Sequence, residues 1–379
     1  MRVTVGMRTP RARFIWVGLA GFAALALAAT GITLMSLPRN ALPASERIIG
    51  LGFEDIVDHA DKLPQLEQRL NEVRATSVSV SVGRTDWTAF PWPDHTDHWS
   101  AAVRDTGRDY VAEAIHAVGK DAAGKPRSII AVIDVLVQGW ITRDPSIAGV
   151  SATGERSTSF PSVTALSTGV VGKRLVALVN EVCQRYSPTA VSLTELFLDT
   201  YTFGGDDLRL YRAFTGASDW PRTPSGAIDT SDPSIGAWRS HAVTALVTRA
   251  ASAAHSHGVK LLMEVRASWN GTHRDPGQDG QDYSALLAVA DRLVIWGYFG
   301  LNNRSGASLE DVARSLPDAE RARFVMSVGL WANSGTISAS DLSQAVTASA
   351  AGGVPAVWVT PASLMDDAHW KALAAAWKR

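Results

Sequence analysis

The stretch Arg185 to Phe203 reads RYSPTAVSLTELFLDTYTF, and the fold prediction starts from it. Ser187 and Pro188 end a helix, because proline lacks the N–H that a helix needs and disfavours helical angles in the residue before it. Ala190 to Thr194 has the apolar character of a short buried strand, and Glu195 follows where that strand ends. A carboxylate at the carboxyl end of a parallel strand is where α/β folds place their chemistry. The alternative is a glutamate on a loop, solvated or paired with an arginine.

Seven other short runs have the apolar character or the period-two alternation of strands, at Ile48–Phe53, Val78–Val82, Arg127–Gly139, Val259–Val265, Arg292–Tyr298, Phe324–Val328 and Val354–Val359. Helical patterns lie between most of them, at Leu63–Val73, Asp109–Val118, Gly172–Tyr186, Ala237–His257, Tyr283–Val289, Leu309–Leu316, Asp341–Ala351 and Asp367–Trp377. Ser340 is placed to cap the helix that begins at Asp341. Apolar strands with helices between them imply a parallel sheet covered by helices. The sequence therefore predicts a (β/α)8 TIM barrel over residues 48–379, with elaborated βα loops at 83–99, 140–163 and 204–233; a doubly wound open sheet is the alternative.

The N-terminal 38 residues have a different character from the rest of the chain. Four arginines precede the apolar run Phe14–Met35, which at about 1.5 Å per residue is long enough to span a bilayer core. We therefore expect a cytoplasmic tip and a membrane anchor at 1–38, a linker at 39–47, and an extracytoplasmic domain after it. A cleaved signal peptide, which would make the domain a secreted one, is the alternative.

Composition excludes several classes of function. A formal net charge of -1 gives no electrostatic reason to expect nucleic acid. The pair Gly204-Gly205 lacks the third glycine and the lysine of a dinucleotide or phosphate loop, so we expect no cofactor. The run Asp94 to His98 has metal-ligating residue types without metal-site spacing, and we interpret it as a solvated loop rather than a metal site.

The chain has 13 tryptophans, many for its length. Aromatic faces at strand ends commonly hold flat, hydroxyl-rich ligands such as sugars, although packing in the core accounts for at least half of a set of this kind. Trp296 and Tyr298 alternate along one predicted strand and therefore point to the same face. The candidate sugar-binding aromatics are Trp87, Trp140, Trp269, Trp296, Tyr298 and Trp331.

Several segments resemble, in order, those of bacterial family-10-like glycosyl hydrolases, which are (β/α)8 barrels. The run RYSPTAVSLTE resembles the family's "rYdvDGihlDd" strand, Ala290–Gly300 resembles "vDylapqlY", and Gly352–Trp358 resembles the final "GadGvvlW". Ile48–Phe53, Val78–Pro93 and Ile129–Trp140 resemble the family's opening strand, its second strand with an aromatic loop, and its "vhaW" strand. The resemblance spans about Ile48 to Lys378. Thr194-Glu195 stands where the family has paired acids, so one acid of that pair is missing, and the resemblance implies the fold more directly than the activity.

Glycoside hydrolysis usually needs two carboxyl groups, one protonated and one ionised. Glu195 ends the fourth predicted strand and Glu264 lies at the end of the fifth. Adjacent barrel strands lie about 4.8 Å apart, so two such carboxyls can approach to roughly 5–6 Å, which suits a retaining mechanism. We assign Glu195 as acid/base and Glu264 as nucleophile. The large barrel clan of retaining glycosidases also keeps its acid/base on the fourth strand, but it keeps its nucleophile on the seventh, where residues 327–334 hold no carboxylate here.

Other polar residues compete for these roles or could assist them. Asp134 falls in the middle of its predicted strand and faces either the interior or the helices. Asp199 could replace Glu195, and Asp86 could bind a sugar hydroxyl. Arg84 and Arg266 lie near strand ends, where they could orient carboxylates.

The sequence thus predicts an exported or membrane-anchored glycoside hydrolase that cleaves a cell-envelope polysaccharide, with a furanose-containing glycan as one option. A non-catalytic glycan-binding barrel is the alternative, and the missing acid of the fourth-strand pair favours it.

Overall fold

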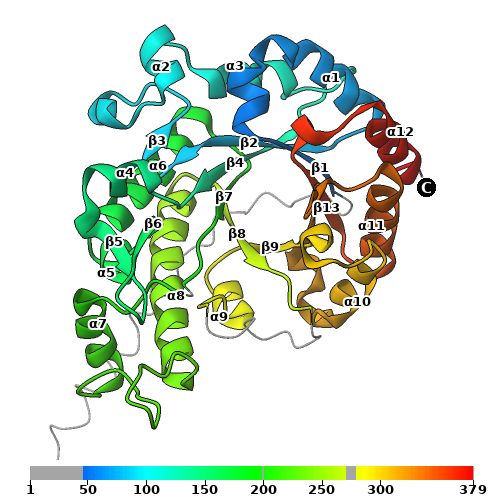
Figure 1. The fold of residues 1–379 in the computed structure, drawn as a ribbon. Helices are drawn as coiled ribbons and strands as arrows, with labels where there is room; N and C mark the ends of the chain where they lie inside the picture. The colour runs from blue at the N-terminus through cyan, green and yellow to red at the C-terminus, as the bar shows by residue number, and fades with distance from the viewer. Residues whose placement is uncertain (1–45, 199, 270–278, 379) are drawn as a thin grey trace, which may run out of the picture. The chain divides into compact units, whose positions relative to one another are not determined.

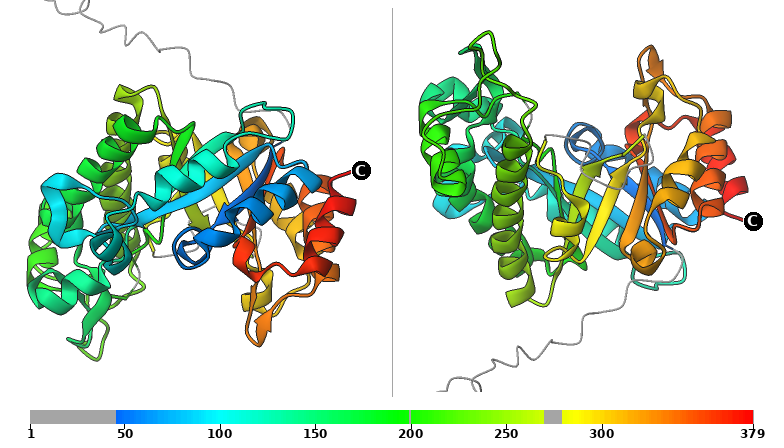
Figure 2. Two further views of the ribbon diagram at one scale, coloured as in Figure 1. Left: turned by 90° about the horizontal axis from the view of Figure 1, so that it is seen from above. Right: turned by 90° about the horizontal axis from the view of Figure 1, so that it is seen from below.

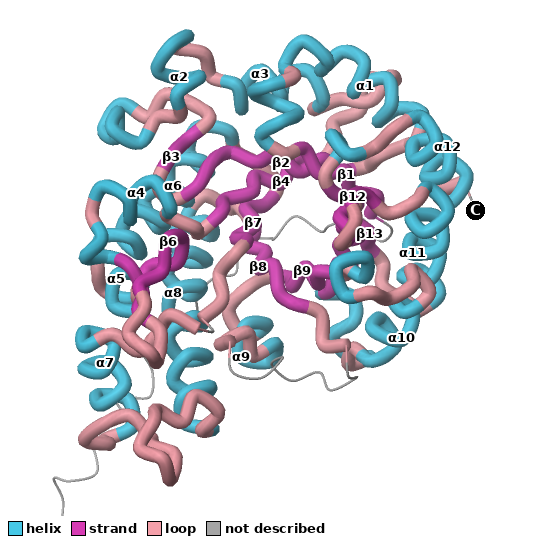
Figure 3. The backbone as a smooth tube through the Cα atoms, in the orientation of Figure 1, coloured by secondary structure: helices cyan, strands magenta, loops and turns pink. Residues whose placement is uncertain are grey.

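A closed barrel of eight parallel strands forms the centre of the domain. The computed structural model describes residues 46–198, 200–269 and 279–378. The barrel strands are β1 (Glu46–Leu51), β2 (Ser77–Arg84), β4 (Ser128–Asp134), β7 (Ala190–Thr194), β8 (Lys260–Arg266), β9 (Arg292–Trp296), β10 (Phe324–Gly329) and β13 (Ala356–Thr360). They pair in parallel in chain order, and β13 returns to pair with β1 (Figures 1 and 3). The predicted closed barrel is therefore confirmed, and the open-sheet alternative is wrong.

A helix follows each barrel strand and covers the outside of the barrel (Figure 3). These helices are α1 (Leu63–Glu72), α3 (Tyr110–Val118), α6 (Val170–Tyr186), α8 (Pro233–Ser256), α9 (Tyr283–Leu287), α10 (Ser308–Ser315), α11 (Ala339–Ala351) and α12 (Asp367–Ala376). Successive side chains of a barrel strand point alternately to the surrounding helices and to the barrel interior. The side that packs against the helices is buried, so it needs apolar side chains.

The period of two along β2 shows how the sequence sorts side chains between the two faces. Val78, Val80 and Val82 belong to the large apolar core that includes the helices, whereas Ser79 and Ser81 line the interior cavity. A separate inner cluster fills the lower part of the barrel, and it comprises Ile48, Ile130, Val132, Ala190, Leu262, Val294, Val325, Ala356 and Trp358. Side chains therefore fill the barrel interior away from the carboxyl ends of the strands and leave a cavity at those ends, where the site lies.

A buried ion pair closes the amino-terminal end of the barrel. Glu46 of β1 accepts a hydrogen bond of 2.7 Å from Arg292 of β9, and Ser77 of β2 donates to the same carboxylate at 2.5 Å. The side chains of Glu46 and Arg292 are 0% and 7% exposed. The pair joins the first barrel strand to the sixth across the interior.

Two segments that the sequence marks as polar loops contain regular structure. The segment between β4 and α6 holds α4 (Gln138–Arg143), the antiparallel pair β5 (Ala148–Val150) and β6 (Arg156–Pro161), and α5 (Val163–Ser167). The segment between β7 and α8 holds α7 (Gly205–Thr215). Figure 2 shows these green elements gathered on one side of the barrel. Short strands of Ser, Thr and Gly carry no apolar periodicity, which is why the sequence pattern misses them.

Three predicted boundaries are wrong in ways that matter. β4 ends at Asp134, not at Gly139, so Asp134 lies at the end of its strand and not in its middle. β1 begins at Glu46, inside the predicted linker. Helix α11 begins at Ala339, and Ser338, not Ser340, caps it by accepting a hydrogen bond from the Asp341 N–H at 3.1 Å.

The predicted membrane anchor or signal segment at 1–38 lies outside the described residues. Within residues 46–198, 200–269 and 279–378, no helix combines the length and the apolar character that crossing a membrane requires.

Candidate active site

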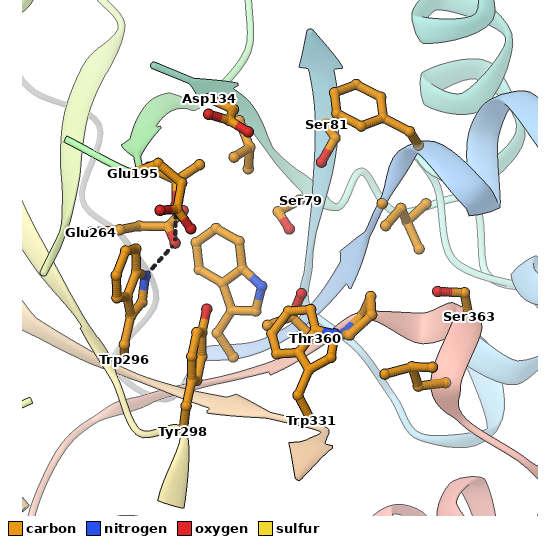
Figure 4. A pocket seen from close by; sticks show the side chains of 18 of the residues that line it. Ser79, Ser81, Asp134, Glu195, Glu264, Trp296, Tyr298, Trp331, Thr360 and Ser363 are labelled. Atoms are coloured by element: carbon orange, nitrogen blue, oxygen red, sulfur yellow. Dashed lines mark hydrogen bonds between the residues drawn. The ribbon is translucent and has the colours of Figure 1, made fainter. Parts of the chain in front are cut away.

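A cavity of about 1000 Å³ opens at the carboxyl ends of the strands (Figure 4). Its wall includes three carboxylates from three consecutive strands of the barrel: Asp134, Glu195 and Glu264. Hydroxyl groups and aromatic rings make up much of the remaining wall: Ser79, Ser81, Thr194, Trp269, Trp296, Tyr298, Trp331, Trp358, Thr360 and Ser363. The combination of acids with aromatic and hydroxyl side chains fits a polar, ring-shaped ligand.

Glu264 is the carboxylate that the protein holds most firmly. It is 6% exposed and accepts hydrogen bonds from Ser192 Oγ at 3.1 Å, Thr194 Oγ1 at 3.0 Å and Trp296 Nε1 at 2.9 Å. Burial raises the pKa of Glu264, whereas the three hydrogen bonds, first that of Trp296, oppose this rise. All three donors favour the charged form, although burial outweighs them and the pKa of Glu264 stays above its ordinary value.

Glu195 reaches the cavity through an unusual backbone conformation. Thr194 faces the interior, so strict alternation would turn the next side chain outward under the helices. Glu195 instead has φ of 60°, in the left-handed region, and its side chain lines the cavity (Figure 4). Such a conformation costs a non-glycine residue roughly 1–3 kcal/mol, and strain of this kind is concentrated at functional sites.

The protonation of Glu195 differs from that of an ordinary glutamate. Its pKa is raised to about 7, first by burial and then by the charges of Asp134 and Glu264. Arg266 and Arg84 act in the opposite direction. Glu195 is therefore substantially protonated near neutral pH, which is what a general acid requires.

Asp134 is held by an arginine at the cavity wall. Arg84 Nε lies 2.9 Å from Asp134 Oδ2, and the Leu136 N–H donates to Oδ1 at 2.8 Å. The pKa of Asp134 is nevertheless raised to about 6, because burial outweighs the arginine. Arg266, the last residue of β8, pairs with Asp279 at 3.3 Å and lies over the Phe197 ring.

The aromatic wall continues from Glu264 towards the opening. The rings of Trp296 and Tyr298 are nearly parallel, with an interplanar angle of 12° and centroids 5.6 Å apart. Trp331 meets Tyr298 edge-on at 5.2 Å. The alternation of Trp296 and Tyr298 thus does place both on the cavity side, although β9 ends at Trp296 and Tyr298 lies beyond it.

Six of the predicted site residues line this one cavity, namely Glu195, Glu264, Trp269, Trp296, Tyr298 and Trp331. Three others lie outside its wall. Asp86 is buried and accepts a hydrogen bond from the Trp140 N–H at 3.1 Å, Trp87 packs on Phe53 with centroids 4.2 Å apart, and Trp140 packs on His98 at 4.9 Å. The contacts described for these three are within the protein, and their sugar-binding roles stay predictions. Asp199 lies outside the described residues.

The sequence underrated several residues of the cavity. The sequence predicts Asp134 in mid-strand because the apolar pattern continues to Val137, beyond the true end of β4. Ser79 and Ser81 were visible only as the polar half of a period-two pattern, and Trp358 and Thr360 as the end of the last strand. The register between neighbouring strands decides which of these residues share one cavity, and the sequence does not give that register.

The run Asp94 to His98 is not a solvated loop throughout. Residues 93–98 form two short 3-10 turns that meet at a kink at His95, and the His98 side chain is buried beside Trp140. Burial lowers the pKa of His98 to about 4, so it is neutral near pH 7. Among the described residues, no group of three or more His, Cys, Asp or Glu side chains is arranged to hold a metal ion.

Three solved structures have the same fold as this chain. The glycoside hydrolase domain of PgaB (BpsB) from Bordetella bronchiseptica superposes with a TM-score of 0.64 at 14% identity, over 87% of this chain and 98% of that one. The cold-adapted β-galactosidase from Rahnella sp. R3 superposes with a TM-score of 0.61 at 12% identity, over 90% of this chain and 56% of that one. The catalytic domain of β-amylase from Paenibacillus polymyxa superposes with a TM-score of 0.59 at 11% identity, over 87% of this chain and 95% of that one.

These likenesses establish a barrel fold of the type that glycoside hydrolases use. No protein-family profile and no curated protein sequence matches the chain. The particular resemblance to family-10-like glycosyl hydrolases therefore stays a prediction.

Proposed function

We propose that the barrel is a glycoside hydrolase in which Glu195 is the general acid/base and Glu264 the nucleophile. The observation that carries this proposal is the contrast between two carboxyls in one cavity. Glu264 accepts three hydrogen bonds that favour its ionised form, while the pKa of Glu195 is raised to about 7 beside two other carboxylates. Burial raises the pKa of both acids, but only Glu264 has hydrogen-bond donors that oppose the rise, and this difference is what supports Glu264 as the ionised acid and Glu195 as the protonated one.

The two acids act in sequence in this proposal. Glu195 gives its proton to the glycosidic oxygen as the bond to the anomeric carbon breaks, and the Glu264 carboxylate attacks that carbon. Glu195, now ionised, takes a proton from water, and the resulting hydroxide displaces Glu264 from the sugar. Glu264 lies on β8 and Glu195 directly follows the neighbouring strand β7. The retaining course is proposed from the spacing of about 4.8 Å between neighbouring strands.

We propose a polysaccharide or oligosaccharide as the substrate. Trp296, Tyr298 and Trp331 offer ring faces and edges to sugar rings, and the hydroxyls of Ser79 and Thr360 offer partners for sugar hydroxyls. The fold neighbours include a glycoside hydrolase domain, a β-galactosidase and a β-amylase, which act on glycosides. From the apolar run at 14–35 we further propose an exported or membrane-anchored protein that acts on a cell-envelope glycan, with a furanose-containing glycan as one option.

The test is hydrolysis by the full-length chain and by its variants. The protein is incubated with a panel of envelope polysaccharides and of gluco-, galacto-, arabino- and chito-oligosaccharides, and new reducing ends are measured. Glu195→Gln and Glu264→Gln should each lower turnover by a factor of about 10² or more. Asp86→Asn, which removes a buried acid outside the cavity, should leave turnover close to that of the original chain.

The proton NMR spectrum of the first product gives its anomeric configuration, and retention is expected. Inversion would remove Glu264 from the role of nucleophile. Equal turnover of Glu195→Gln, Glu264→Gln and the original chain would contradict the assignment of both residues.

A non-catalytic glycan-binding barrel is the second candidate. Thr194 stands where an acid is expected, and its hydroxyl is engaged with Glu264, so one acid of the expected pair is replaced by a supporting donor. Calorimetric titration distinguishes the two candidates. If the original chain binds a glycan of the panel without cleaving it, and Glu264→Gln binds it equally well, the binding protein is the correct description.

A further inference from the structure

Asp134 is a third carboxylate in a cavity whose proposed reaction needs two. It is the last residue of β4, and its Cα is paired with that of Arg84 on β2 and with that of Thr194 on β7. Its Oδ2 faces the Arg84 Nε at 2.9 Å, and its Oδ1 accepts from the Leu136 N–H. A guanidinium and an amide N–H both hold the carboxylate in place and favour its ionised form, against the burial that raises its pKa to about 6, so Asp134 is mostly ionised near pH 7.

Glu195 follows Thr194 directly and therefore sits between two carboxylates. Asp134 lies on the β4 side and Glu264 on the β8 side (Figure 4). The other charges that face it are Arg84 from β2, which is paired with Asp134, and Arg266 from β8, which is paired with Asp279. Within the part of the chain that the structure describes, no hydrogen bond is donated to the Glu195 carboxyl. The two neighbouring carboxylates and this lack of a donor among the described residues both favour the protonated form of Glu195.

Resting on the proposed function, we propose that Asp134, held by Arg84, is a positioning residue that keeps Glu195 protonated until the glycosidic oxygen takes its proton. Asp134 itself neither exchanges a proton nor forms a bond in the reaction. Of the two carboxylates that raise the pKa of Glu195, Asp134 contributes more than Glu264. Burial remains the largest cause, so Asp134 adjusts a proton affinity that the cavity has already increased.

The position of Asp134 matters most after the first proton transfer. Once Glu264 is bound to the sugar its charge is lost, and with it one of the two repulsions that oppose ionisation of Glu195. Asp134 forms no bond to the sugar, so above its pKa of about 6 it keeps its charge in both steps. It therefore keeps Glu195 basic enough to take a proton from the attacking water, which breaks the O–H bond of water as the hydroxyl oxygen bonds to the anomeric carbon.

The experiment is a titration that needs no substrate. The full-length protein carrying ¹³C-labelled glutamate is titrated by NMR, and the Glu195 signal is assigned by its loss in Glu195→Gln. In Asp134→Asn the pKa of Glu195 should fall by about one unit, because one neighbouring charge has gone. Glu54→Gln is the matched control. It removes another carboxylate from the cavity wall, one that is not among the charges facing Glu195, and it should leave this pKa in place.

In Asp134→Asn the alkaline limb of the pH profile of kcat/KM should move to lower pH, by the same one unit or so as the pKa of Glu195. Asp134→Ser, which also removes the charge, gives the same reading if the asparagine variant does not fold. A Glu195 signal that titrates alike in the original chain and in Asp134→Asn would overturn the proposal, even if activity were lost. If no glycan is cleaved by any form, the proposed function fails, and the titration still decides whether the two carboxyls are coupled.

Discussion

The hydrogen bond from Trp296 to Glu264 can be removed without removing the ring. In Trp296→Phe the aromatic face beside Tyr298 remains, while the donor 2.9 Å from Glu264 Oε2 is lost. Glu264 keeps the hydroxyls of Ser192 and Thr194 as donors. The substitution therefore isolates one interaction of a buried carboxylate.

The expected magnitude follows from the charge and burial of the acceptor. A hydrogen bond to a charged group contributes about 1.5–3 kcal/mol, which corresponds to roughly one to two pKa units. Burial and the lost donor act in the same direction, so the pKa of Glu264 rises. Since the ionised form is the active one, the acid limb of the pH profile should move to higher pH by roughly one to two units, and kcat/KM below this limb should fall about 10- to 150-fold.

The assay is kcat/KM against pH on the best glycan of the panel, with a thermal melt to establish that the variant is folded. Trp331→Phe is the control: Trp331 also lines the cavity, and none of the described hydrogen bonds joins it to Glu264. It should raise KM with little effect on the acid limb. If Trp296→Phe keeps both its acid limb and its kcat/KM within about twofold, Glu264 is not the group that must ionise.

Three further predictions concern Glu195, the cap of α11 and the buried ion pair of the barrel. Because the proposed mechanism needs a protonated Glu195 and its pKa is about 7, hydrolysis should decline as the pH rises through 7, and Glu195→Gln should abolish it together with this dependence. Ser338→Ala should lower the free energy of unfolding by about 1 kcal/mol in a denaturant titration, whereas Ser340→Ala should leave it nearly unchanged. Arg292→Met should lower it by about 3–5 kcal/mol, because Glu46 is left charged and buried, and Glu46→Leu in the same chain should restore part of the loss; equal stability of the single and double variants would contradict this account.

The barrel could be predicted from the sequence because its strands are marked by a strong physical constraint. A strand covered by helices must present apolar side chains to them, as Val78, Val80 and Val82 do, and this pattern survives without any knowledge of neighbours. The additional elements β5, β6 and α7 meet no such constraint, because they are not part of the barrel wall. The strands β5 and β6 are short and mostly polar, so the sequence predicts loops there; α7 does carry apolar residues at helical spacing, and the sequence prediction misses it within a long polar segment.

The site could be predicted only where a strand end was visible. Glu195 and Glu264 were found because each lies near the end of an apolar run, but alternation alone would have turned Glu195 away from the cavity. Its left-handed backbone is what brings it in, and a local angle of this kind at a residue other than glycine leaves no sequence signal. Asp134 was undervalued for the opposite reason, since the apolar run continued past the true end of its strand.

The ion pair at the base of the barrel bears on how the N-terminal segment can be processed. Glu46 supplies the only carboxylate that the described contacts give to the buried Arg292, and it lies beyond the predicted anchor or signal segment at 1–38. Cleavage before Glu46 leaves β1 and its ion pair intact. Cleavage after Glu46 would leave the buried Arg292 guanidinium without its carboxylate partner. A mature terminus, if one is made, must therefore fall upstream of Glu46.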